Sequence, residues 1–458
     1  MPIWLSALIT LSLLVLLSGL AFSASYYVAP TGNDEDAGTQ EKPWLTLQHA
    51  VDQVAPGDTI LVESGTYAGC QMGRSGAADA PCTLKAAPGA KVIVDRPGDG
   101  NRRRSIIEVG THREITSYWV VEGLEVMNAP RWGINLGRTD HVTVRNCVVH
   151  GCGLTGIFTS FSDHTLIESN ESYGNHEHGI YHSNSGDYPI LRGNRSHHND
   201  GCGIHMNGDL NMGGDGIISH AVVEDNVIWE NGKPRGGSAI NCDGVSDSII
   251  RNNLCYENHA SGISLYAIDA AEGSSRNLVC NNTVVVAKDG RWALNIPWWQ
   301  RRPAPVGNRA VNNILLSLNP DTGAIVIWGK EALAESDHNV VTDRFALDGV
   351  IAKEMAMPRG EDDHSPEGGR SPRPLRDWRK HGYDAHSRIA ASHALFVDPA
   401  HGDYHLHSGS PAIGAGRQLP EVTADLEGRS RKGRKGWEAG CYLASPPGAG
   451  EAAGPRRK

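Results

Sequence analysis

Five side chains that can move protons or hold charged groups lie at matched places in a repeating part of the sequence. They are Tyr181, His205, Asn207, Asn241 and Asp243. A phenol, an imidazole and a carboxylate can each exchange a proton, and imidazole titrates close to neutral pH. Two amides can hold a carboxylate by hydrogen bonds. The set suits the removal of a proton next to a carboxylate, provided that one fold brings the five together.

The elements that would bring them together come from a repeat. A small residue followed by isoleucine recurs, and the isoleucine numbers differ by 23, 23, 24, 36 and 23, at Ile134, Ile157, Ile180, Ile204, Ile240 and Ile263. Pairs of asparagines precede the later four, at Asn170 and Asn175, Asn194 and Asn199, Asn226 and Asn231, Asn253 and Asn258. Repetition at this period indicates a solenoid. Short β-branched strings between turn residues indicate strands, so the sequence predicts an all-β, right-handed parallel β-helix.

The direction of each side chain follows from the strand period. If the repeated isoleucine points inward, the residues one and three places later point outward. The first outward file is then Asn135, Phe158, Tyr181, His205, Asn241 and Ser264. The second is Gly137, Ser160, Ser183, Asn207, Asp243 and Tyr266. Because parallel strands lie roughly 4.8 Å apart, the five reactive side chains should form one compact patch on an exposed surface.

Residues around this patch offer further chemistry. The 36-residue spacing inserts a glycine-rich stretch after Asn207, which forms either a cleft wall or an ordinary surface loop. Asp209 and Asp215, together with Asp243, could gather Ca²⁺, which prefers oxygen ligands. His176 and His178 have metal-ligand spacing, although polar turn residues fit that pattern better. His182 falls on the inward file, where a hydrogen-bonded core histidine is expected.

A downstream cluster of tryptophans and arginines suits sugar binding. Flat indole faces can stack on sugar rings, and guanidinium groups pair with carboxylates. The residues are Trp292, Trp298, Trp299, Arg291 and Arg301. The alternative is that at least one of these tryptophans packs against the side of the solenoid.

Composition restricts the partners. The net charge of −10 is mild for 458 residues and shows no basic stripe, which argues against nucleic acid. A hydrophobic content of 39% is enough for a core. We expect a monomer.

The chain divides into five parts by pattern. Residues 1–24 are typical of an export signal, with an uncleaved membrane anchor as the alternative, and no later stretch could span a bilayer. Residues 25–80 form an N-terminal cap with a short helix and the first coils. The parallel β-helix covers 81–345, and 346–444 hold C-terminal coils with an excursion loop. Residues 445–458 are predicted to be a disordered tail.

Nine cysteines leave at least one thiol unpaired, since the number is odd. Cys70 and Cys82 are the pair most suited to a disulfide. Cys147 and Cys152 also lie close in sequence, whereas Cys242 falls on the inward file and is expected to be a small core residue.

The two ends of the mature sequence resemble a known group. The opening runs from Tyr26 to Asn33, and the closing signature includes Phe396 to Pro399 and Ser410 to Gly416. Together with the repeats, they resemble secreted right-handed β-helix proteins of the polysaccharide lyase type, such as alginate, chondroitin and pectate lyases, and uncharacterised bacterial β-helix repeat proteins. The resemblance implies export to the periplasm, cell surface or medium, and an acidic polysaccharide as partner. Those lyases commonly use a lysine or arginine base, but Lys233 is the single lysine between Lys91 and Lys288.

The leading hypothesis is a lyase that cleaves a uronate-containing polysaccharide by β-elimination. His205 would act as the base and Tyr181 as the acid, while Asn207 and Asn241, or Ca²⁺, would neutralise the carboxylate. A C5-epimerase would begin with the same proton abstraction. A glycoside hydrolase needs two carboxylates, and only Asp243 lies in the patch. A glycan-binding surface solenoid without catalysis is the remaining alternative.

Overall fold

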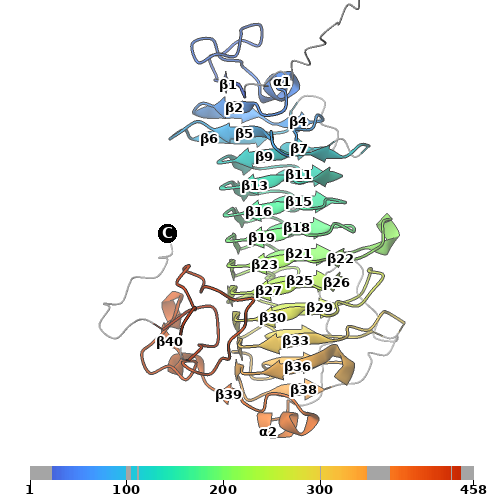
Figure 1. Ribbon diagram of the computed structural model, residues 1–458, viewed down its shortest axis with the longest axis vertical. Coiled ribbons are helices and arrows are strands. Elements are labelled where there is room, and N and C mark those ends of the chain that lie inside the picture. Colours follow the sequence, from blue (N-terminus) through green and yellow to red (C-terminus); the bar gives the residue numbers. More distant parts are fainter. Residues whose placement is uncertain are drawn as a thin grey trace, which may run out of the picture.

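The computed structural model describes residues 23–98, 105–110, 113–299, 301–347, 372–434 and 436–444. It is a parallel β-helix whose coils contribute strands to three long sheets (Figure 1). The predicted all-β solenoid is confirmed. Residues 1–22, most of the predicted excursion and the predicted tail lie outside the described residues. No helix among the described residues is long and apolar enough to cross a membrane.

The strands of the three sheets follow one another in each coil. Sheet A contains β1 (Ser25–Val28), β2 (Thr59–Val62), β5 (Cys82–Ala86), β9 (Trp119–Glu122), β13 (Thr143–Arg145), β16 (Leu166–Glu168), β19 (Ile190–Arg192), β23 (Val222–Glu224), β27 (Ile249–Arg251), β30 (Leu278–Cys280), β33 (Asn308–Val311) and β36 (Leu333–Asp337). Sheet B contains β3 (Gly65–Ala68), β6 (Val92–Arg96), β10 (Glu125–Met127), β14 (Val148–His150), β17 (Glu171–Tyr173), β20 (Arg195–His197), β24 (Val227–Trp229), β28 (Leu254–Tyr256), β31 (Thr283–Val286), β34 (Ile314–Ser317), β37 (Val340–Val341) and β39 (Arg388–Ile389).

Sheet C carries the repeated isoleucines. Its strands are β4 (Cys70–Met72), β7 (Ile107–Val109), β11 (Ile134–Gly137), β15 (Ile157–Ser160), β18 (Ile180–Ser183), β21 (Ile204–Asn207), β25 (Ile240–Asp243), β29 (Ile263–Tyr266), β32 (Leu294–Ile296), β35 (Ile325–Ile327) and β38 (Phe345–Leu347). The isoleucines from Ile134 to Ile263 pair in register and are 0% exposed. The predicted inward file is therefore confirmed, and with it the register of sheet C.

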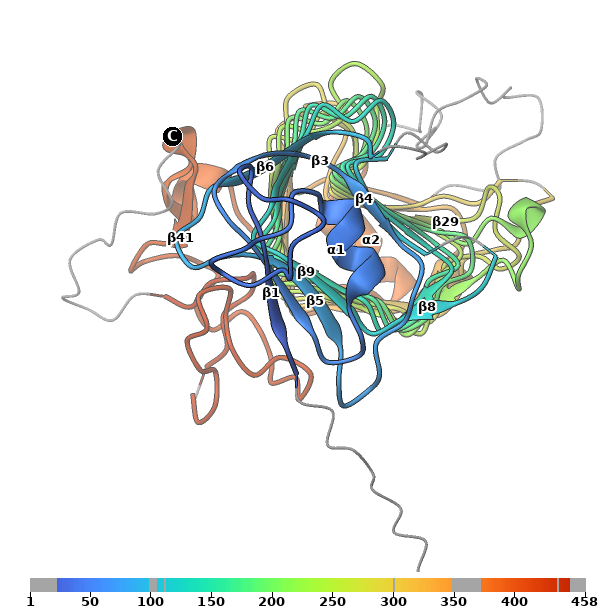
Figure 2. The ribbon, with the colours of Figure 1, turned by 90° about the horizontal axis from the view of Figure 1, so that it is seen from above.

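Short elements complete the fold. Two small parallel sheets join β8 (Thr116–Ser117) to β12 (Thr139–Asp140) and β22 (Ile218–Ser219) to β26 (Val245–Ser246), and β40 (Phe396–Asp398) pairs antiparallel with β41 (Asp403–Leu406). The helices are α1 (Leu47–Gln53), α2 (Leu375–Trp378), η1 (Leu210–Met212), η2 (Lys330–Ala332), η3 (Arg379–His381), η4 (Ser392–Ala394) and η5 (Pro399–His401). Helix α1 lies across the N-terminal end of the coil stack, as predicted, and α2 lies at the opposite end (Figures 1 and 2).

The repeated asparagines form buried ladders at the bends between sheets. Asn226 is 0% exposed, and its Oδ1 accepts hydrogen bonds from the backbone N–H and the Nδ2 of Asn194 in the preceding coil, at 2.9 and 3.1 Å. Its own Nδ2 donates to Leu191 O and to Oδ1 of Asn253 in the next coil, both at 2.9 Å. Each amide therefore satisfies buried backbone groups that the bend removes from the sheets.

Breaking one ladder should cost stability without altering the surface. We expect Asn226→Ala to lower the free energy of unfolding by about 2–4 kcal/mol, because it leaves buried donors of Asn194 without an acceptor. Urea unfolding followed by circular dichroism measures this change. Asn33→Ala, at an exposed turn, should change the free energy by no more than about 0.5 kcal/mol. Equal effects of the two substitutions would contradict the ladder's role.

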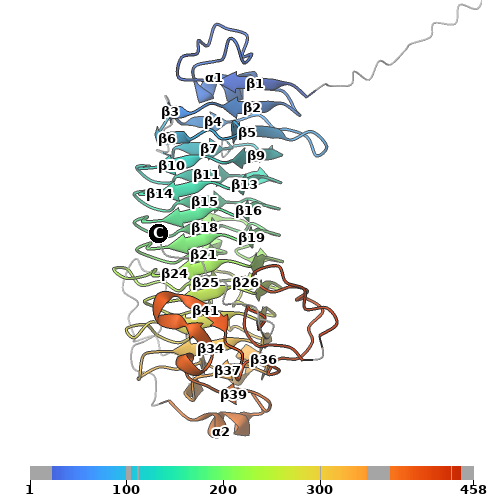
Figure 3. The same cartoon turned by 90° about the vertical axis from the view of Figure 1, so that its left-hand side faces the viewer.

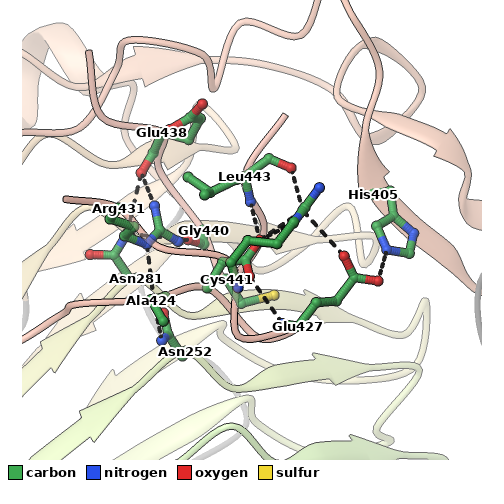
Figure 4. A network of polar contacts seen from close by, with 12 residues as sticks. Asn252, Asn281, His405, Ala424, Glu427, Arg431, Glu438, Gly440, Cys441 and Leu443 are labelled. Atoms are coloured by element: carbon green, nitrogen blue, oxygen red, sulfur yellow. Dashed lines mark hydrogen bonds and ion pairs between the residues drawn. The ribbon is translucent and has the colours of Figure 1, made fainter. Parts of the chain in front are cut away.

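The C-terminal segment folds back along the outer faces of sheets A and B (Figures 1 and 3). Its apolar side chains cover those faces: Leu395, Phe396 and Tyr404 pack with sheet B residues such as Tyr256. The segment is held internally by Arg431, which is 1% exposed and donates to backbone oxygens of Ala424, Glu438 and Gly440 (Figure 4).

Polar contacts join this segment to successive coils. Asn252 donates to Ala424 O, Asn281 donates to Glu438 O and Gly440 O, and Asn312 donates to Arg417 O. Each of these asparagines has a positive φ, which turns its side chain away from the coil. In the sequence each of them is the first residue of an Asn-Asn pair, but this pattern does not show which distant segment the side chains bind.

The disulfide expectation is wrong. Cys70 lies on β4 of sheet C and Cys82 on β5 of sheet A, and both are reduced, buried thiols. Burial raises the pKa of Cys70 to about 12 and that of Cys82 to about 11. Their closeness in sequence misled the prediction, because a turn of the coil places them on different sheets. Cys242 lies in the hydrophobic core, as expected.

Candidate active site

The five predicted side chains lie on three neighbouring strands of sheet C. Tyr181 on β18 pairs with His205 on β21, which pairs with Asn241 on β25. Two residues further along, Asn207 of β21 pairs with Asp243 of β25. The structure thus brings these five residues together, on the face of sheet C opposite the isoleucines.

The patch is more buried than expected. His205 is 1% exposed, Asn241 is 0% and Asp243 is 2%, whereas Tyr181 is half-buried. The alternation of side chains along a strand predicts which face of the sheet each side chain is on. It does not predict which other groups cover that face, so the expectation of an exposed surface is wrong. The side chain of His205 is therefore closed to solvent, whereas that of Tyr181 is partly accessible.

A column of aromatic rings follows the outer face of sheet C. Trp132 stacks on Phe158 with centroids 4.5 Å apart, Phe158 meets Tyr181 edge-on at 5.3 Å, and Tyr181 stacks on His205 at 4.5 Å. The guanidinium of Arg131 lies 4.0 Å above the Trp132 ring. Rings from neighbouring coils cover the ring faces of Tyr181 and His205. A ligand could therefore contact these two side chains only through their polar edges. Trp132 and Arg131 had no repeat position that would mark them in the sequence.

His178 fixes the proton on His205. The backbone N–H of Cys202 donates to Nδ1 of His178 at 2.9 Å, so the proton of the neutral His178 ring resides on Nε2. This Nε2 lies 3.3 Å from Nδ1 of His205 and donates to it. His205 must therefore carry its own proton on Nε2. A neutral imidazole held in this tautomer is a hydrogen-bond donor, which disfavours the predicted role of His205 as a base.

The two amides of the patch are engaged in orienting other groups. Asn207 Nδ2 donates to the Tyr181 hydroxyl at 3.3 Å, and Asn207 Oδ1 accepts from the backbone N–H of Asp209. Asn241 Nδ2 donates to the hydroxyl of Tyr266 at 2.7 Å. Tyr266, which lay in the predicted outward file but outside the predicted site, thus joins the patch.

Asp243 holds the loop that follows β29. Its two carboxylate oxygens accept the backbone N–H groups of Ile268 and Asp269, at 2.8 and 3.1 Å. Burial raises the pKa of Asp243 to about 7, although these two hydrogen bonds act in the opposite direction. The glycine-rich insertion also contacts this loop, through Leu210 N–H to Asp269 O, and projects beside sheet C (Figure 2).

The raised pKa of Asp243 predicts a pH-dependent stability. Because the folded state binds this proton more tightly than the unfolded state, deprotonation should lower the free energy of unfolding between about pH 4 and pH 7. The slope from this group is at most about 1.4 kcal/mol per pH unit. Asp243→Asn lacks this proton, so its stability deficit relative to wild type should shrink as pH rises through this window. Urea unfolding at several pH values measures it, and a constant deficit would contradict the prediction.

The residues present do not fit a calcium site. Asp209 accepts the N–H of Asn211, and Asp215 accepts the N–H of Ile217, each capping its own turn. Among the described residues, the clusters of three potential metal ligands do not include Asp209, Asp215 or Asp243. Ca²⁺ takes about six to eight oxygen ligands, and this donor set does not converge to supply them. A requirement for Ca²⁺ stays a prediction.

The predicted tryptophan cluster is mostly structural. Trp299 is 7% exposed and packs with Tyr266 and Ile268, and Trp292 is 8% exposed and packs with Val326. Their burial corrects the expectation that both present open faces to sugar. Trp298 is half-buried and donates through Nε1 to Arg302 O at 2.9 Å.

Among the predicted arginines, Arg291 and Arg301 have different surroundings. Arg301 is exposed. Arg291 lies beside Gly236, in the turn that leads into β25, and so stands near the strand that carries Asn241. Of these two arginines, Arg291 is therefore the one whose side chain lies beside the turn before β25.

Two other histidines have clear environments. His182 is 0% exposed, donates from Nε2 to Gly186 O at 2.9 Å, and accepts at Nδ1 from the hydroxyl of Thr159 at 2.7 Å. Burial lowers its pKa to about 4, so it is a neutral core histidine, as expected. The side chain of His176 is 72% exposed and pairs with Asp200, so it does not share a metal site with buried His178.

Comparison with known proteins identifies the family of this chain. The profile described as "Pel9A-like, right handed beta helix region" matches residues 26–283, more than half of the 458 residues. The chain belongs to this family.

Relatives of this Pel9A-like protein include a pectate lyase. The protein named pectate lyase PEL9 of Emericella nidulans is 29% identical over 320 residues, covering 58% of this chain and 76% of that protein. The crystal structure of pectate lyase Pel9A aligns with a TM-score of 0.59 and 16% identity, covering 93% of this chain and 98% of that one. A rhamnogalacturonan lyase aligns with a TM-score of 0.54 and 16% identity, covering 69% and 87%. At these identities the two structures establish the shared fold.

Proposed function

We propose that this Pel9A-like protein is a lyase that cleaves a uronate-containing polysaccharide by β-elimination. In this reaction the proton on C5 of the uronate is removed, the bond from C4 to the glycosidic oxygen breaks, and a C4=C5 double bond forms. The proton finally resides on the departing oxygen. The observation that carries the proposal is the pairing of a phenol with a tautomer-fixed imidazole, Tyr181 and His205, on adjacent strands.

The geometry favours a different division of roles from the one expected from sequence. The hydroxyl of Tyr181, which accepts an N–H from Asn207, takes the C5 proton and gives a proton to the departing oxygen, so that the phenol ends as it began. His205 donates its Nε2–H to the carboxylate, where negative charge develops. Arg291, which precedes β32, pairs with the same carboxylate. Asn207 and Asn241 position the two phenols.

A substrate screen tests this function. Alginate, pectate, glycosaminoglycans and ulvan-like polymers are incubated with the full chain, with and without Ca²⁺, and ultraviolet absorbance reports the unsaturated uronate. Absorbance that rises with chain scission supports the lyase. Exchange of the C5 proton without scission would instead indicate an epimerase, and binding without any turnover a glycan-binding solenoid.

One observation favours a glycoside hydrolase as the second candidate. Burial raises the pKa of Asp243 to about 7, and the negative charge of Asp269 raises it further, which indicates a second carboxyl group nearby. A carboxyl group with a raised pKa can act as a general acid in glycoside hydrolysis. New reducing ends without ultraviolet absorbance in the same screen would indicate this reaction.

Secretion by way of residues 1–24 stays a prediction.

His178 acts on the reaction through His205, as a positioning residue. We expect His178→Phe to lower kcat by about 10–100-fold, because His205 is then no longer held in one tautomer. His178→Gln should restore most of the activity, since its amide can accept from Cys202 N–H and donate to His205. Rescue by glutamine is the decisive readout: kcat should fall in the Phe variant and recover in the Gln variant, while KM changes little in either. A kcat of the Phe variant equal to that of wild type would contradict the positioning role.

A further inference from the structure

Three potential metal ligands meet where the last coil of sheet A contacts the returning chain. Asp337 ends β36, His338 follows it, and His386 precedes β39. One ligand atom from each residue lies within 4.8 Å of the others. The cluster therefore joins two parts of the chain separated by 49 residues in sequence. Its residues are far in sequence from the patch on sheet C. They lie at the end of a sheet A strand and just before a sheet B strand.

The hydrogen bonds of His338 prepare one nitrogen for a metal. Its Nδ1–H donates to the backbone oxygen of Ala415 at 3.0 Å, which leaves the lone pair of Nε2 for the cluster. This Nε2 lies 3.9 Å from Oδ2 of Asp337. Histidines that bind metals almost always donate their other ring N–H to a carbonyl or carboxylate in this way.

Asp337 is oriented by the backbone. Its Oδ1 accepts the N–H groups of His338 and His386, both at 2.8 Å. Its Oδ2 lies 2.7 Å from Nδ1 of His386. The two imidazole rings stack with centroids 4.9 Å apart. Backbone groups hold Asp337 and His338, and Nδ1 of His386 is hydrogen-bonded to Oδ2 of Asp337, so a bound ion would take the place of the proton between these two atoms.

Partial exposure gives an ion access to this point. The side chain of His386 is 68% exposed, while those of Asp337 and His338 are 17% and 22% exposed. Solvent could supply the remaining ligand of a tetrahedral ion.

In the other two clusters of potential metal ligands, no histidine in the described part of the chain has a ring nitrogen freed in this way by a hydrogen bond from its other ring N–H to the backbone. In the cluster of His178, Cys202 and His205, Nδ1 of His178 accepts a backbone N–H, so its Nε2 carries a proton instead of a lone pair. In the cluster on Asp140, both His141 and His164 place Nδ1 on the same oxygen, Oδ1, at 2.8 and 2.9 Å. Among the described contacts, no backbone oxygen accepts a hydrogen bond from either of these rings, whereas Ala415 O accepts one from His338.

We propose that Asp337, His338 and His386 bind a divalent transition metal ion, with Zn²⁺ as the best match to two imidazole nitrogens and one carboxylate oxygen. The ion would link the end of sheet A to the chain entering β39. It would also hold the stretch around Ala415, through His338. The site is independent of the proposed lyase reaction and predicts a stabilising ion rather than a catalytic one.

Calorimetric titration of the metal-free full chain with Zn²⁺ tests the proposal. We expect one ion per chain, and a loss of affinity of more than about tenfold in His338→Ala and in His386→Ala. His401→Ala is the matched control, because His401 is exposed and contacts a single carboxylate, Asp398, at 2.7 Å. The control should bind Zn²⁺ as wild type does, and only the wild type and the control should gain melting temperature on adding Zn²⁺.

Co²⁺ in place of Zn²⁺ reports which ligands are used. Weak visible bands without a strong near-ultraviolet thiolate band are expected for nitrogen and oxygen ligands. A thiolate band would show a cysteine ligand, as in the cluster of Cys202, and would overturn the proposal. Binding that persists unchanged in the double variant His338→Ala/His386→Ala would also overturn it, as would no binding of Zn²⁺ by the wild type.

Discussion

Replacing Tyr181 by phenylalanine is expected to lower kcat for elimination by about 10²–10⁴, because the hydroxyl that takes the C5 proton and protonates the departing oxygen is lost. The KM should change little, since the ring keeps its stacking on His205 at 4.5 Å. Initial rates on the polymer identified by the substrate screen measure both parameters through the ultraviolet absorbance of the product.

The control for this substitution is Tyr188→Phe. Tyr188 lies in another ring column, between His164 and His220, and is 48% exposed. Its hydroxyl has no place in the proposed reaction, so kcat should equal that of wild type. If Tyr181→Phe also retained full activity while the wild type eliminated, another base would be required, and Lys233, exposed in the turn before β25, is the first residue to test.

Replacing His205 by alanine is expected to lower kcat by about 10²–10³, the effect typical of removing one donor to a developing negative charge. His205→Gln should recover part of this loss, because an amide N–H can take the place of Nε2–H. A base would behave differently, since glutamine cannot accept a proton at neutral pH. The ratio of the Gln and Ala rates therefore separates a donor from a base.

Stability measurements distinguish a loss of catalysis from a loss of folding. His205 is buried and contacts both His178 and Tyr181, so His205→Ala could disturb the column of rings. Urea unfolding of each variant shows whether the fold persists. A folded Ala variant with the wild-type kcat would contradict the proposed role of His205.

The sequence was sufficient to predict the scaffold, because one isoleucine per coil fixes the register of sheet C. A slip of one residue would have exchanged its faces, yet Ile134 to Ile263 are all buried inside. The same periodicity placed Tyr181 and His205 side by side. It could not show that a backbone N–H of Cys202 determines the tautomer of His178, because that contact joins the segments before β18 and β21, in neighbouring coils.

Contacts made outside the repeat also could not be predicted from the sequence. The tryptophans near residue 299 looked suited to sugars by type alone, but Trp299 packs with Tyr266 and Ile268. Cys70 and Cys82 looked paired because they are close in sequence, but they lie on different sheets. In each case the residue's neighbour depends on how distant coils meet, which a repeat of local pattern does not encode.

The C-terminal segment changes how this solenoid should come apart. In a simple solenoid each coil contacts only its neighbours, so coils can unravel one at a time from an end. Here Asn252, Asn281 and Asn312, on three successive coils, are all tied to the same segment. Those coils should therefore open as one cooperative unit in hydrogen exchange, whereas coils such as those of β9 to β14, with no such clamp among the described contacts, can open singly. We therefore expect the N-terminal coils to unfold one at a time and the C-terminal coils to unfold together.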